Sequence, residues 1–285
     1  MNRLLKKRLR ILYERIKVPG KLIRLLLHLV GLYKRGFRNA LNIQLTHYEL
    51  FFQNLPEAFD GYTLLVATDF HIDSELHLVP RLRTLLGSVE ADVLLLLGDY
   101  RYSLDGPYDR VLTRMQRVVQ AAQVKEGIFA IRGNHDSKEL MEHMAPLGMR
   151  VLDNASVTLT RNDQQMFIVG VDDPHYDQLD DLPRALTNIP KSAFKILMAH
   201  TSEIYKEAHS LGISLYLCGH THGGQIDIKH IGPVITNVHA PRRFARGVWS
   251  YRGMQGFTST GVGTSSVPVR FNCPPELVLL TLKKA

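Results

Sequence analysis

Residues 217–225 read LCGHTHGGQ, in which one threonine separates two histidines and two glycines follow. Imidazole nitrogens are common ligands of divalent transition metals, and glycine lets the backbone turn tightly near a bound ion. The stretch therefore indicates either a histidine-rich turn or part of a metal site. The second interpretation predicts further ligand-type residues elsewhere in the chain.

Such residues follow five short apolar runs. The runs cover 63–67, 92–97, 127–131, 194–199 and 214–218, and each suits a strand that is buried on both faces. The residues that come after them are Asp69, His71, Asp99, Asn134, His135, Asp136, His200, His220 and His222. Any one of these could belong to a turn or a helix cap. The same chemistry at five successive strand ends indicates one shared site.

The elements between the runs predict how these residues come together. Helix-like segments over 76–88 and 107–123 alternate with the runs, and this alternation is typical of an α/β sheet. In such sheets, binding sites gather beyond the carboxyl ends of the strands. From the residues alone, we expect a layered α/β domain whose second half is rich in strands, at 157–161, 167–173 and 276–282.

The mixture of ligand types limits the choice of ion. Carboxylate oxygen together with imidazole nitrogen suits Mn, Fe or Zn, whereas an all-oxygen set suits Mg or Ca. A buried carboxylate without a partner is unfavourable, and two nearby dications reverse that balance. Gly98, Gly133 and Gly219 stand beside the ligand-type residues, where they allow the backbone to approach the ions.

The ordered motifs DFH (69–71), GDY (98–100), GNHD (133–136), AH (199–200) and GHTHGGQ (219–225) resemble the calcineurin-like metallophosphoesterase superfamily. The closing stretch TSTGVGTSSVPVRFNCPPELVLLTL is similar to the bacterial membrane-associated phosphodiesterase branch of that superfamily, which includes UDP-2,3-diacylglucosamine pyrophosphatase-type members. The resemblance covers about residues 62–282. It implies a four-layer α/β/β/α sandwich of two mixed β-sheets.

The resemblance also implies a role for each residue. One metal ion would be held by Asp69, His71 and His222, and the other by Asn134, His200 and His220. Asp99 would bridge the two ions. His135 would stabilise the transition state or protonate the leaving oxygen, and Asp136 would orient His135 through a hydrogen bond.

The implied cofactors are two divalent ions, with Mn²⁺ expected and Fe or Zn as alternatives. The implied reaction is hydrolysis of a phosphodiester or pyrophosphate bond, in which a hydroxide that bridges the metals attacks phosphorus in line.

Four arginines are candidates for substrate binding. Arg101 and Arg132 flank the predicted site, where they either contact phosphate or form ion pairs. Arg242 and Arg243 belong to HAPRRFARGVWSY, which interleaves arginines with Phe244, Trp249 and Tyr251. This segment either lines the entrance of the site, where arginine suits phosphate and aromatic rings suit a base or an acyl chain, or forms an exposed turn. The remaining histidines are interpreted as surface or packing residues: 28, 47, 77, 143, 175, 209, 230 and 239.

The positive charge of the chain is concentrated at its N-terminus. The net charge is +8, but residues 1–40 contain twelve Lys or Arg and one acidic residue, so residues 41–285 carry −3. A slightly acidic body argues against a nucleic-acid partner. Apolar residues at three- and four-residue steps over 4–17 and 21–35, separated by Pro19-Gly20, predict two basic amphipathic helices that are too short in apolar sequence to span a membrane.

We therefore expect a basic amphipathic helical arm over 1–45, which binds a membrane surface or packs on the body, and a metallophosphoesterase domain over 60–285. The expected location is cytoplasmic, peripherally associated with the inner face of the cell membrane. A nucleotide-lipid such as UDP-2,3-diacylglucosamine would combine a phosphate site with a membrane surface. Other lipid or nucleotide substrates, a nucleic-acid phosphodiesterase and a non-catalytic scaffold on the same fold are the alternatives. No obligate protein partner is predicted.

Overall fold

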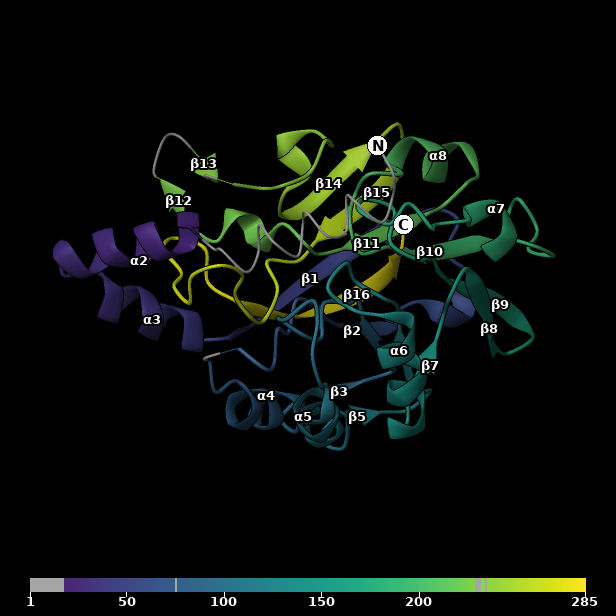
Figure 1. Ribbon diagram of the computed structural model, residues 1–285. Coiled ribbons are helices and arrows are strands. Elements are labelled where there is room, and N and C mark those ends of the chain that lie inside the picture. Colours follow the sequence, from purple (N-terminus) through teal and green to yellow (C-terminus); the bar gives the residue numbers. More distant parts are fainter. Residues whose placement is uncertain (1–17, 75, 229–231, 234) are drawn as a thin grey trace.

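Two mixed six-stranded sheets face each other at the centre of the structure, a computed structural model that describes residues 18–74, 76–228, 232–233 and 235–285 (Figure 1). The first sheet contains, in spatial order, β1 (Gln44–Phe52), β16 (Glu276–Lys284), β2 (Thr63–Ala67), β4 (Val93–Leu96), β6 (Ile128–Ala130) and β7 (Arg150–Val151). The second sheet contains, in spatial order, β14 (Gly247–Tyr251), β15 (Met254–Thr258), β11 (Leu215–Cys218), β10 (Phe194–Met198), β9 (Gln164–Gly170) and β8 (Ala155–Arg161). Two short ladders pair β3 (Glu90–Ala91) with β5 (Gln123–Val124) and β12 (Asp227–Ile228) with β13 (Gly232–Pro233).

Helices cover the outer face of each sheet. The α-helices of the body are α4 (Val79–Leu86), α5 (Asp109–Val119), α6 (Lys138–Met144), α7 (Leu182–Ala185) and α8 (Tyr205–Ser210). The 3₁₀ helices are η1 (Glu57–Phe59), η2 (Ala145–Leu147), η3 (His222–Gly224) and η4 (Arg242–Phe244). Apolar side chains of α4, α5 and α6 pack on the first sheet, and those of α7, α8 and η4 pack on the second. The predicted four-layer α/β/β/α sandwich of two mixed β-sheets is confirmed.

The central strands carry apolar residues on both faces because each sheet is covered on both sides. On β2, Leu64 and Val66 enter the core between the sheets, while Leu65 packs with the helices. On β11, Leu217 enters the same inter-sheet core and Tyr216 packs on the opposite side. This double burial explains why the strands appear in the sequence as continuous apolar runs.

Parallel pairing brings the ends of the predicted runs together. Strands β2, β4 and β6 are parallel neighbours in the first sheet, and β10 and β11 are parallel neighbours in the second. Their carboxyl ends therefore lie at one edge of each sheet. The observed strands match the five predicted runs to within one residue at each end.

The first sheet also contains a strand that precedes residue 60. Strand β1 pairs in parallel with β16 from Gln44↔Glu276 to Phe52↔Lys284, so two segments that are far apart in the sequence lie side by side. The sheet of the body thus begins near the end of the predicted 1–45 arm.

The prediction of a single helix over 21–35 is wrong. The structure has α2 (Val18–Leu29) and α3 (Tyr33–Leu41), separated at Gly31, whose φ of 71° lies in the left-handed region. Glycine adopts this conformation without steric cost and ends the first helix. Pro19-Gly20, predicted to separate two helices, lies inside the first turn of α2, where proline loses no helical hydrogen bond. The helix predicted over 4–17 lies outside the described residues.

Helices α2 and α3 project from one end of the sandwich, at the left of Figure 1. Ile23 and Leu27 of α2 pack with Val267 and Val269 of the body. The opposite side of α2 exposes the side chains of Leu22, Leu25, Leu26 and Leu29, which are 51–74% accessible. Among the described helices, none has the length and apolar character that crossing a membrane requires.

Candidate dinuclear metal centre

All seven predicted metal ligands follow central strands, six of them on loops and His222 at the first residue of η3. Asp69 and His71 follow β2, Asp99 follows β4, and Asn134 follows β6 of the first sheet. His200 follows β10, and His220 and His222 follow β11 of the second sheet. The candidate site therefore lies where the carboxyl edges of the two sheets meet.

Five of these residues have a left-handed backbone. Asp69, His71, Asp99, His220 and His222 have φ values between 41° and 67°, a region that residues other than glycine seldom adopt. Such a conformation costs on the order of 1–3 kcal/mol and persists only where neighbours impose it. Here the amide of Asp69 donates to the Gly98 carbonyl, and that of His71 donates to the Asp99 carbonyl. Concentrated backbone strain of this kind is typical of functional sites.

Two glycines make the close approach of these loops possible. A Cβ atom on Gly133 would collide with the backbone nitrogen and the carboxylate of Asp99. A Cβ atom on Gly219 would lie 2.5 Å from Oδ2 of Asp69. Any side chain at either position would displace a predicted ligand.

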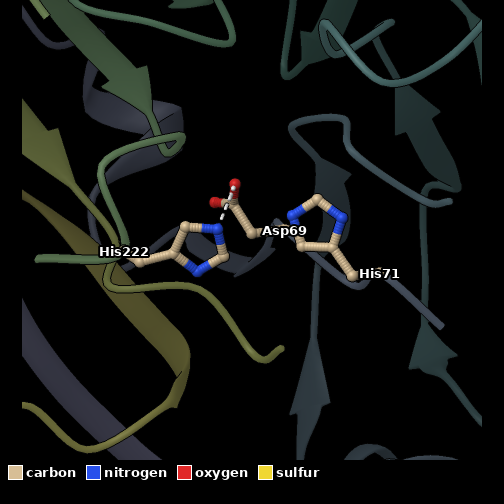
Figure 2. A group of neighbouring side chains, drawn as sticks. All are labelled: Asp69, His71 and His222. Carbon is tan, nitrogen blue, oxygen red and sulfur yellow. Dashed lines mark ion pairs between the residues drawn. The ribbon is translucent and has the colours of Figure 1, made fainter. Parts of the chain in front are cut away.

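The first group consists of Asp69, His71 and His222, all buried (Figure 2). Oδ1 of Asp69 lies 3.5 Å from Nε2 of His222. The rings of His71 and His222 are stacked with their centres 5.3 Å apart. Candidate ligand atoms of all three residues lie within 4.8 Å of one another, which is close enough to bind a single ion.

The second group consists of Asn134, His200 and His220. Nε2 of His200 lies 3.1 Å from Oδ1 of Asn134 and 3.3 Å from Nδ1 of His220. The ring centres of the two histidines are 5.1 Å apart. Nε2 of His220 faces the carbonyl of Asn237 at 3.2 Å, which favours a proton on Nε2 and leaves the lone pair of Nδ1 toward the group.

Asp99 lies between the two groups. Its Oδ2 atom is 3.6 Å from Nε2 of His71 in the first group and 3.4 Å from Nε2 of His200 in the second. Its Oδ1 atom accepts a hydrogen bond from the backbone amide of His135 at 2.8 Å, which fixes the carboxylate plane. A bridging role for Asp99 requires this position.

Backbone carbonyls contact the Nδ1 atoms of His71 and His200 and fix the orientation of both rings. Nδ1 of His71 lies 2.9 Å from the Arg101 carbonyl, and Nδ1 of His200 lies 2.7 Å from the Leu97 carbonyl. Because a carbonyl only accepts, both Nδ1 atoms carry a proton, and the Nε2 atoms, which face Asp99, are the ones that could bind an ion. Carbonyl contacts of this kind orient imidazole rings for metal binding.

The charges in the pocket favour cations. Burial alone would lower the pKa of His200, but Asp99 and Asp69 outweigh it and raise that pKa to about 10, so this ring holds a second proton that a bound metal ion would displace. Burial raises the pKa of Asp69, whereas the nearby imidazoles, chiefly His200, overcome burial and hold the pKa of Asp99 well below its usual range. Burial also lowers the pKa of His220 well below its usual range, which keeps this imidazole neutral, as a metal ligand must be.

The residues fit a pair of transition-metal ions. Within the described residues, Oδ1 of Asp69 and Nε2 of His71 are buried and have no hydrogen-bond partner. Orphaned buried polar atoms are unfavourable unless a ligand satisfies them. Since both atoms belong to a set of carboxylate, amide and imidazole donors, divalent ions of the Mn, Fe or Zn type are the appropriate partners.

His135 and Asp136 lie beside the two groups. Nδ1 of His135 is 2.8 Å from the Tyr102 carbonyl, and this contact holds the ring. The carboxylate of Asp136 instead accepts the backbone amides of Asp99 at 2.7 Å and Gly133 at 2.9 Å. The orienting bond that the resemblance implied is thus replaced: Asp136 shapes the backbone that carries Asp99, and the Tyr102 carbonyl orients His135.

Arg101 and Arg132 are buried and have protein partners. Nη2 of Arg101 donates to the Asp105 carbonyl at 2.5 Å. Nε of Arg132 donates to Asp172 at 2.5 Å, and its Nη1 donates to Asp177 at 2.6 Å. For Arg132, the structure thus has the ion-pair arrangement that was the alternative to phosphate contact.

The segment 239–251 divides between core and surface. Phe244 and Trp249 are buried, with their rings stacked 4.2 Å apart on the outer face of the second sheet. The interpretation that these two rings line the entrance of the site is therefore wrong, because both rings belong to the hydrophobic core on the outer face of the second sheet. Arg242 and Arg243 are exposed on η4.

Arg270 is a residue of the site that the sequence did not reveal. It is completely buried, and its guanidinium donates to the carbonyls of His222 at 2.9 Å, Thr260 at 2.7 Å and Gly263 at 2.6 Å. Its Nη2 atom lies 3.3 Å from Nδ1 of His222. No strand end or metal-type spacing precedes Arg270 in the sequence, so no signal distinguished it from a surface arginine.

Comparisons with known proteins agree with this geometry. The family model described as calcineurin-like phosphoesterase matches residues 62–224, more than half of the chain. The uncharacterized metallophosphoesterase YkuE of Bacillus subtilis (strain 168) is 26% identical and covers 85% of this chain and 86% of its own length. The phosphodiesterase YaeI of Escherichia coli (strain K12) is 27% identical, and the match covers 67% of this chain and 70% of YaeI. A transmembrane protein with metallophosphoesterase domain from Danio rerio is 24% identical, and the match covers 82% of this chain and 56% of that protein.

Proposed function

Because this chain belongs to the calcineurin-like phosphoesterase family, we propose that its seven convergent side chains hold two divalent ions and hydrolyse phosphodiester or diphosphate bonds. The observation that carries this proposal is the position of Asp99, whose Oδ2 atom lies 3.4–3.6 Å from one histidine of each group. Asp69, His71 and His222 would hold one ion, and Asn134, His200 and His220 the other. Mn²⁺ is the proposed metal.

When bound, such an ion pair ionises a water molecule at neutral pH and neutralises charge on phosphate. The side chains of this protein supply the rest. His135 carries its proton on Nδ1 because that atom contacts the Tyr102 carbonyl, so Nε2 is the atom that can serve a phosphoryl oxygen. When the ring is protonated, Nε2–H would stabilise developing negative charge or protonate the leaving oxygen.

We further propose a substrate at a membrane surface, with a nucleotide-lipid such as UDP-2,3-diacylglucosamine as the leading choice. Hydrolysis of its diphosphate would release UMP and a lipid monophosphate. Three features support membrane contact: the exposed leucines of α2, the exposed basic residues of α2 and α3 (Lys21, Lys34, Arg35 and Arg38), and the transmembrane relative from Danio rerio. The phosphodiesterase YaeI supports the alternative of a general phosphodiesterase.

The catalytic proposal is tested with the purified full chain, Mn²⁺ and bis-p-nitrophenyl phosphate. We expect Asp99→Asn to lose one or both ions and at least about a hundredfold in activity. His135→Ala should retain both ions and lose about 10²–10⁴-fold in kcat, because the proposal assigns His135 to catalysis and not to metal binding. The matched control is Asp163→Asn, since Asp163 is exposed and also has a left-handed φ, of 61°. Full activity in Asp99→Asn would contradict the proposal.

The substrate is tested with a panel of UDP-linked lipids, glycerophospholipids and cyclic nucleotides. Release of UMP from UDP-2,3-diacylglucosamine with a kcat/KM well above that of the other compounds supports the nucleotide-lipid proposal. A preference for glycerophospholipids or cyclic nucleotides would replace it by the general phosphodiesterase, and the metal centre would be unaffected.

A further inference from the structure

A third cluster of metal-type side chains lies next to the centre described above. It consists of His175 after β9, Glu203 after β10 and His239 before η4, and we call it the His175–Glu203–His239 cluster. Oε1 of Glu203 lies 2.8 Å from Nδ1 of His175 and 3.3 Å from Nδ1 of His239. Both histidines were interpreted from the sequence as surface or packing residues, because neither follows one of the five apolar runs that lead to the predicted ligands.

We propose that the His175–Glu203–His239 cluster is a third cation-binding site, separate from the dinuclear centre, and that it takes a zinc-type dication. Two imidazoles and one carboxylate are the donor set of several catalytic zinc sites, which leave a fourth position for water or another ligand. Imidazole donors also disfavour Mg²⁺ and Ca²⁺.

The spacing of the rings matches that of imidazoles that share an ion. Two imidazoles bound to one tetrahedral zinc ion at about 2.0–2.1 Å place their ring centres about 5 Å apart. The ring centres of His175 and His239 are 5.3 Å apart. The two histidine pairs assigned to the dinuclear centre have nearly the same spacing, 5.3 Å for His71 with His222 and 5.1 Å for His200 with His220.

The cluster is largely preorganised. The side chains of His175 and Glu203 are only 10% and 14% exposed, whereas that of His239 is 87% exposed. The backbone amide of His239 also donates to Oε1 of Glu203 at 2.8 Å, which anchors this third residue. Burial alone would raise the pKa of Glu203, but the hydrogen bonds from His175 and from the His239 amide outweigh it and hold that pKa below its usual range. The carboxylate is therefore ionised at neutral pH.

The cluster is in contact with the second metal group. The ring of His175 lies 5.4 Å from that of His220, and Asn237, two residues before His239, accepts from Nε2 of His220 at 3.2 Å. The side chain of Asn237 donates to the hydroxyl of Tyr176 at 2.6 Å. A cation in the cluster would add positive charge at the edge of the dinuclear centre.

The proposal is tested by counting ions. The full-length protein and its variants are stripped with a chelator and dialysed against a small excess of Zn²⁺, and bound zinc per chain is measured by elemental analysis. His239→Ala and Glu203→Gln should each bind one zinc fewer than the wild type. His239 is exposed and Gln keeps an acceptor oxygen, so both variants should fold. His77→Ala, which removes another exposed histidine, should bind as many ions as the wild type.

The difference between variants is independent of the number of ions in the dinuclear centre. If the wild type binds three zinc ions and His239→Ala binds two, both the dinuclear centre and the third site are supported. If the wild type binds one zinc ion and His239→Ala binds none, only the third site is supported. Equal zinc content in the wild type, His239→Ala and Glu203→Gln would overturn the third site and leave the dinuclear centre standing. A loss in His77→Ala equal to that in His239→Ala would also overturn it, as nonspecific binding to surface histidines.

Discussion

The guanidinium of Arg270 connects the loop of His222 with the loop that carries Thr260 and Gly263. Its planar fork of donors suits several carbonyls at once, which a lysine ammonium cannot match. Burial lowers the pKa of Arg270, so its charge in this place is maintained against a desolvation penalty. At the residue scale, Arg270 is therefore a positioning residue for His222.

We predict that Arg270→Lys weakens the first metal site. The expected result is a shift of the Mn²⁺ concentration needed for half-maximal activity by about 10–100-fold, with activity recovered in part at high Mn²⁺. Mn²⁺ titrations of bis-p-nitrophenyl phosphate hydrolysis measure it, with the exposed Arg117→Lys on α5 as the control. An unchanged Mn²⁺ requirement together with lower thermal stability would show that Arg270 serves only the fold.

The sequence predicted which side chains converge better than it predicted the contacts that support them. Asp69, Asp99 and His200 each follow an apolar run, so their residue types and place in the chain indicate a shared site. The partners of Arg132 and the contacts of Arg270 depend on loops that come together only in three dimensions. The same applies to the His175–Glu203–His239 cluster, whose members come from three separate loops.

At the element scale, a charged cluster joins the two sheets near the amino ends of β4 and β6, the ends of these strands that lie away from the metal centre. Arg161 of β8 donates to Asp92, just before β4, at 2.8 Å and to Glu126 at 2.7 Å. Glu126 also accepts from the hydroxyl of Tyr62 at 2.7 Å, and the Arg161 guanidinium lies 4.4 Å from the centre of the Tyr62 ring. Arg161 therefore links the second sheet to residues that flank strands of the first.

We predict that Arg161→Met lowers the free energy of unfolding by about 1–3 kcal/mol at pH 7, because it leaves partly buried carboxylates without their partner. Burial alone would raise the pKa of Asp92, but hydrogen bonds from Thr63 and Arg161 outweigh it and lower that pKa below 3.8. The stabilisation by ionised Asp92 is therefore complete above its unfolded pKa and is lost as the pH falls through the lower folded value.

The difference between wild type and Arg161→Met should accordingly shrink as the pH falls below about 3.8. Urea unfolding between pH 3 and pH 7 measures it, and Arg117→Met on the exposed side of α5 is the control. A difference that stays constant over this range would mean that Arg161 stabilises the fold through packing on Tyr62 alone.

The five strands that lead to the site were predicted more accurately than the helix boundaries, whereas the strand expected over 167–173 lies at Gln164–Gly170. Double burial makes a strand appear as an unbroken apolar run, as for β2 and β10, and such a run has clear ends. The helix predicted over 21–35 failed because Gly31 can either continue a helix at a modest cost or end it with a left-handed φ. The sequence alone does not decide between these outcomes, since the contacts of α3 with the body contribute to the choice.

At the scale of the whole molecule, long-range pairing limited what the sequence could predict. Strands β1 and β16 pair across more than two hundred residues, and no local pattern encodes that register. The layered α/β class follows from alternation of strands and helices, but the four-layer arrangement came from the resemblance to a family. The segregation of charge, by contrast, was visible at once, with a basic N-terminal segment and a slightly acidic body.

The basic N-terminal segment and the exposed leucines of α2 together predict peripheral binding to anionic membranes. We expect the full chain to bind vesicles that contain anionic phospholipid and to bind them less tightly as salt is raised, since the basic residues contribute roughly 1 kcal/mol each near such a surface. Leu25→Ser combined with Leu29→Ser should reduce vesicle affinity at least about tenfold, because it removes apolar area that would enter the interface. Vesicle co-sedimentation measures both effects.

Both leucines are exposed, at 55% and 74%, so the double variant should keep the thermal stability of the wild type. The control is Val248→Ser, which removes an apolar side chain that is 48% exposed on β14, on the body of the protein. If the double variant binds vesicles as tightly as the wild type, α2 does not enter the interface. In that case the exposed face of α2 needs another partner, and the proposal of a membrane-surface substrate loses its structural support.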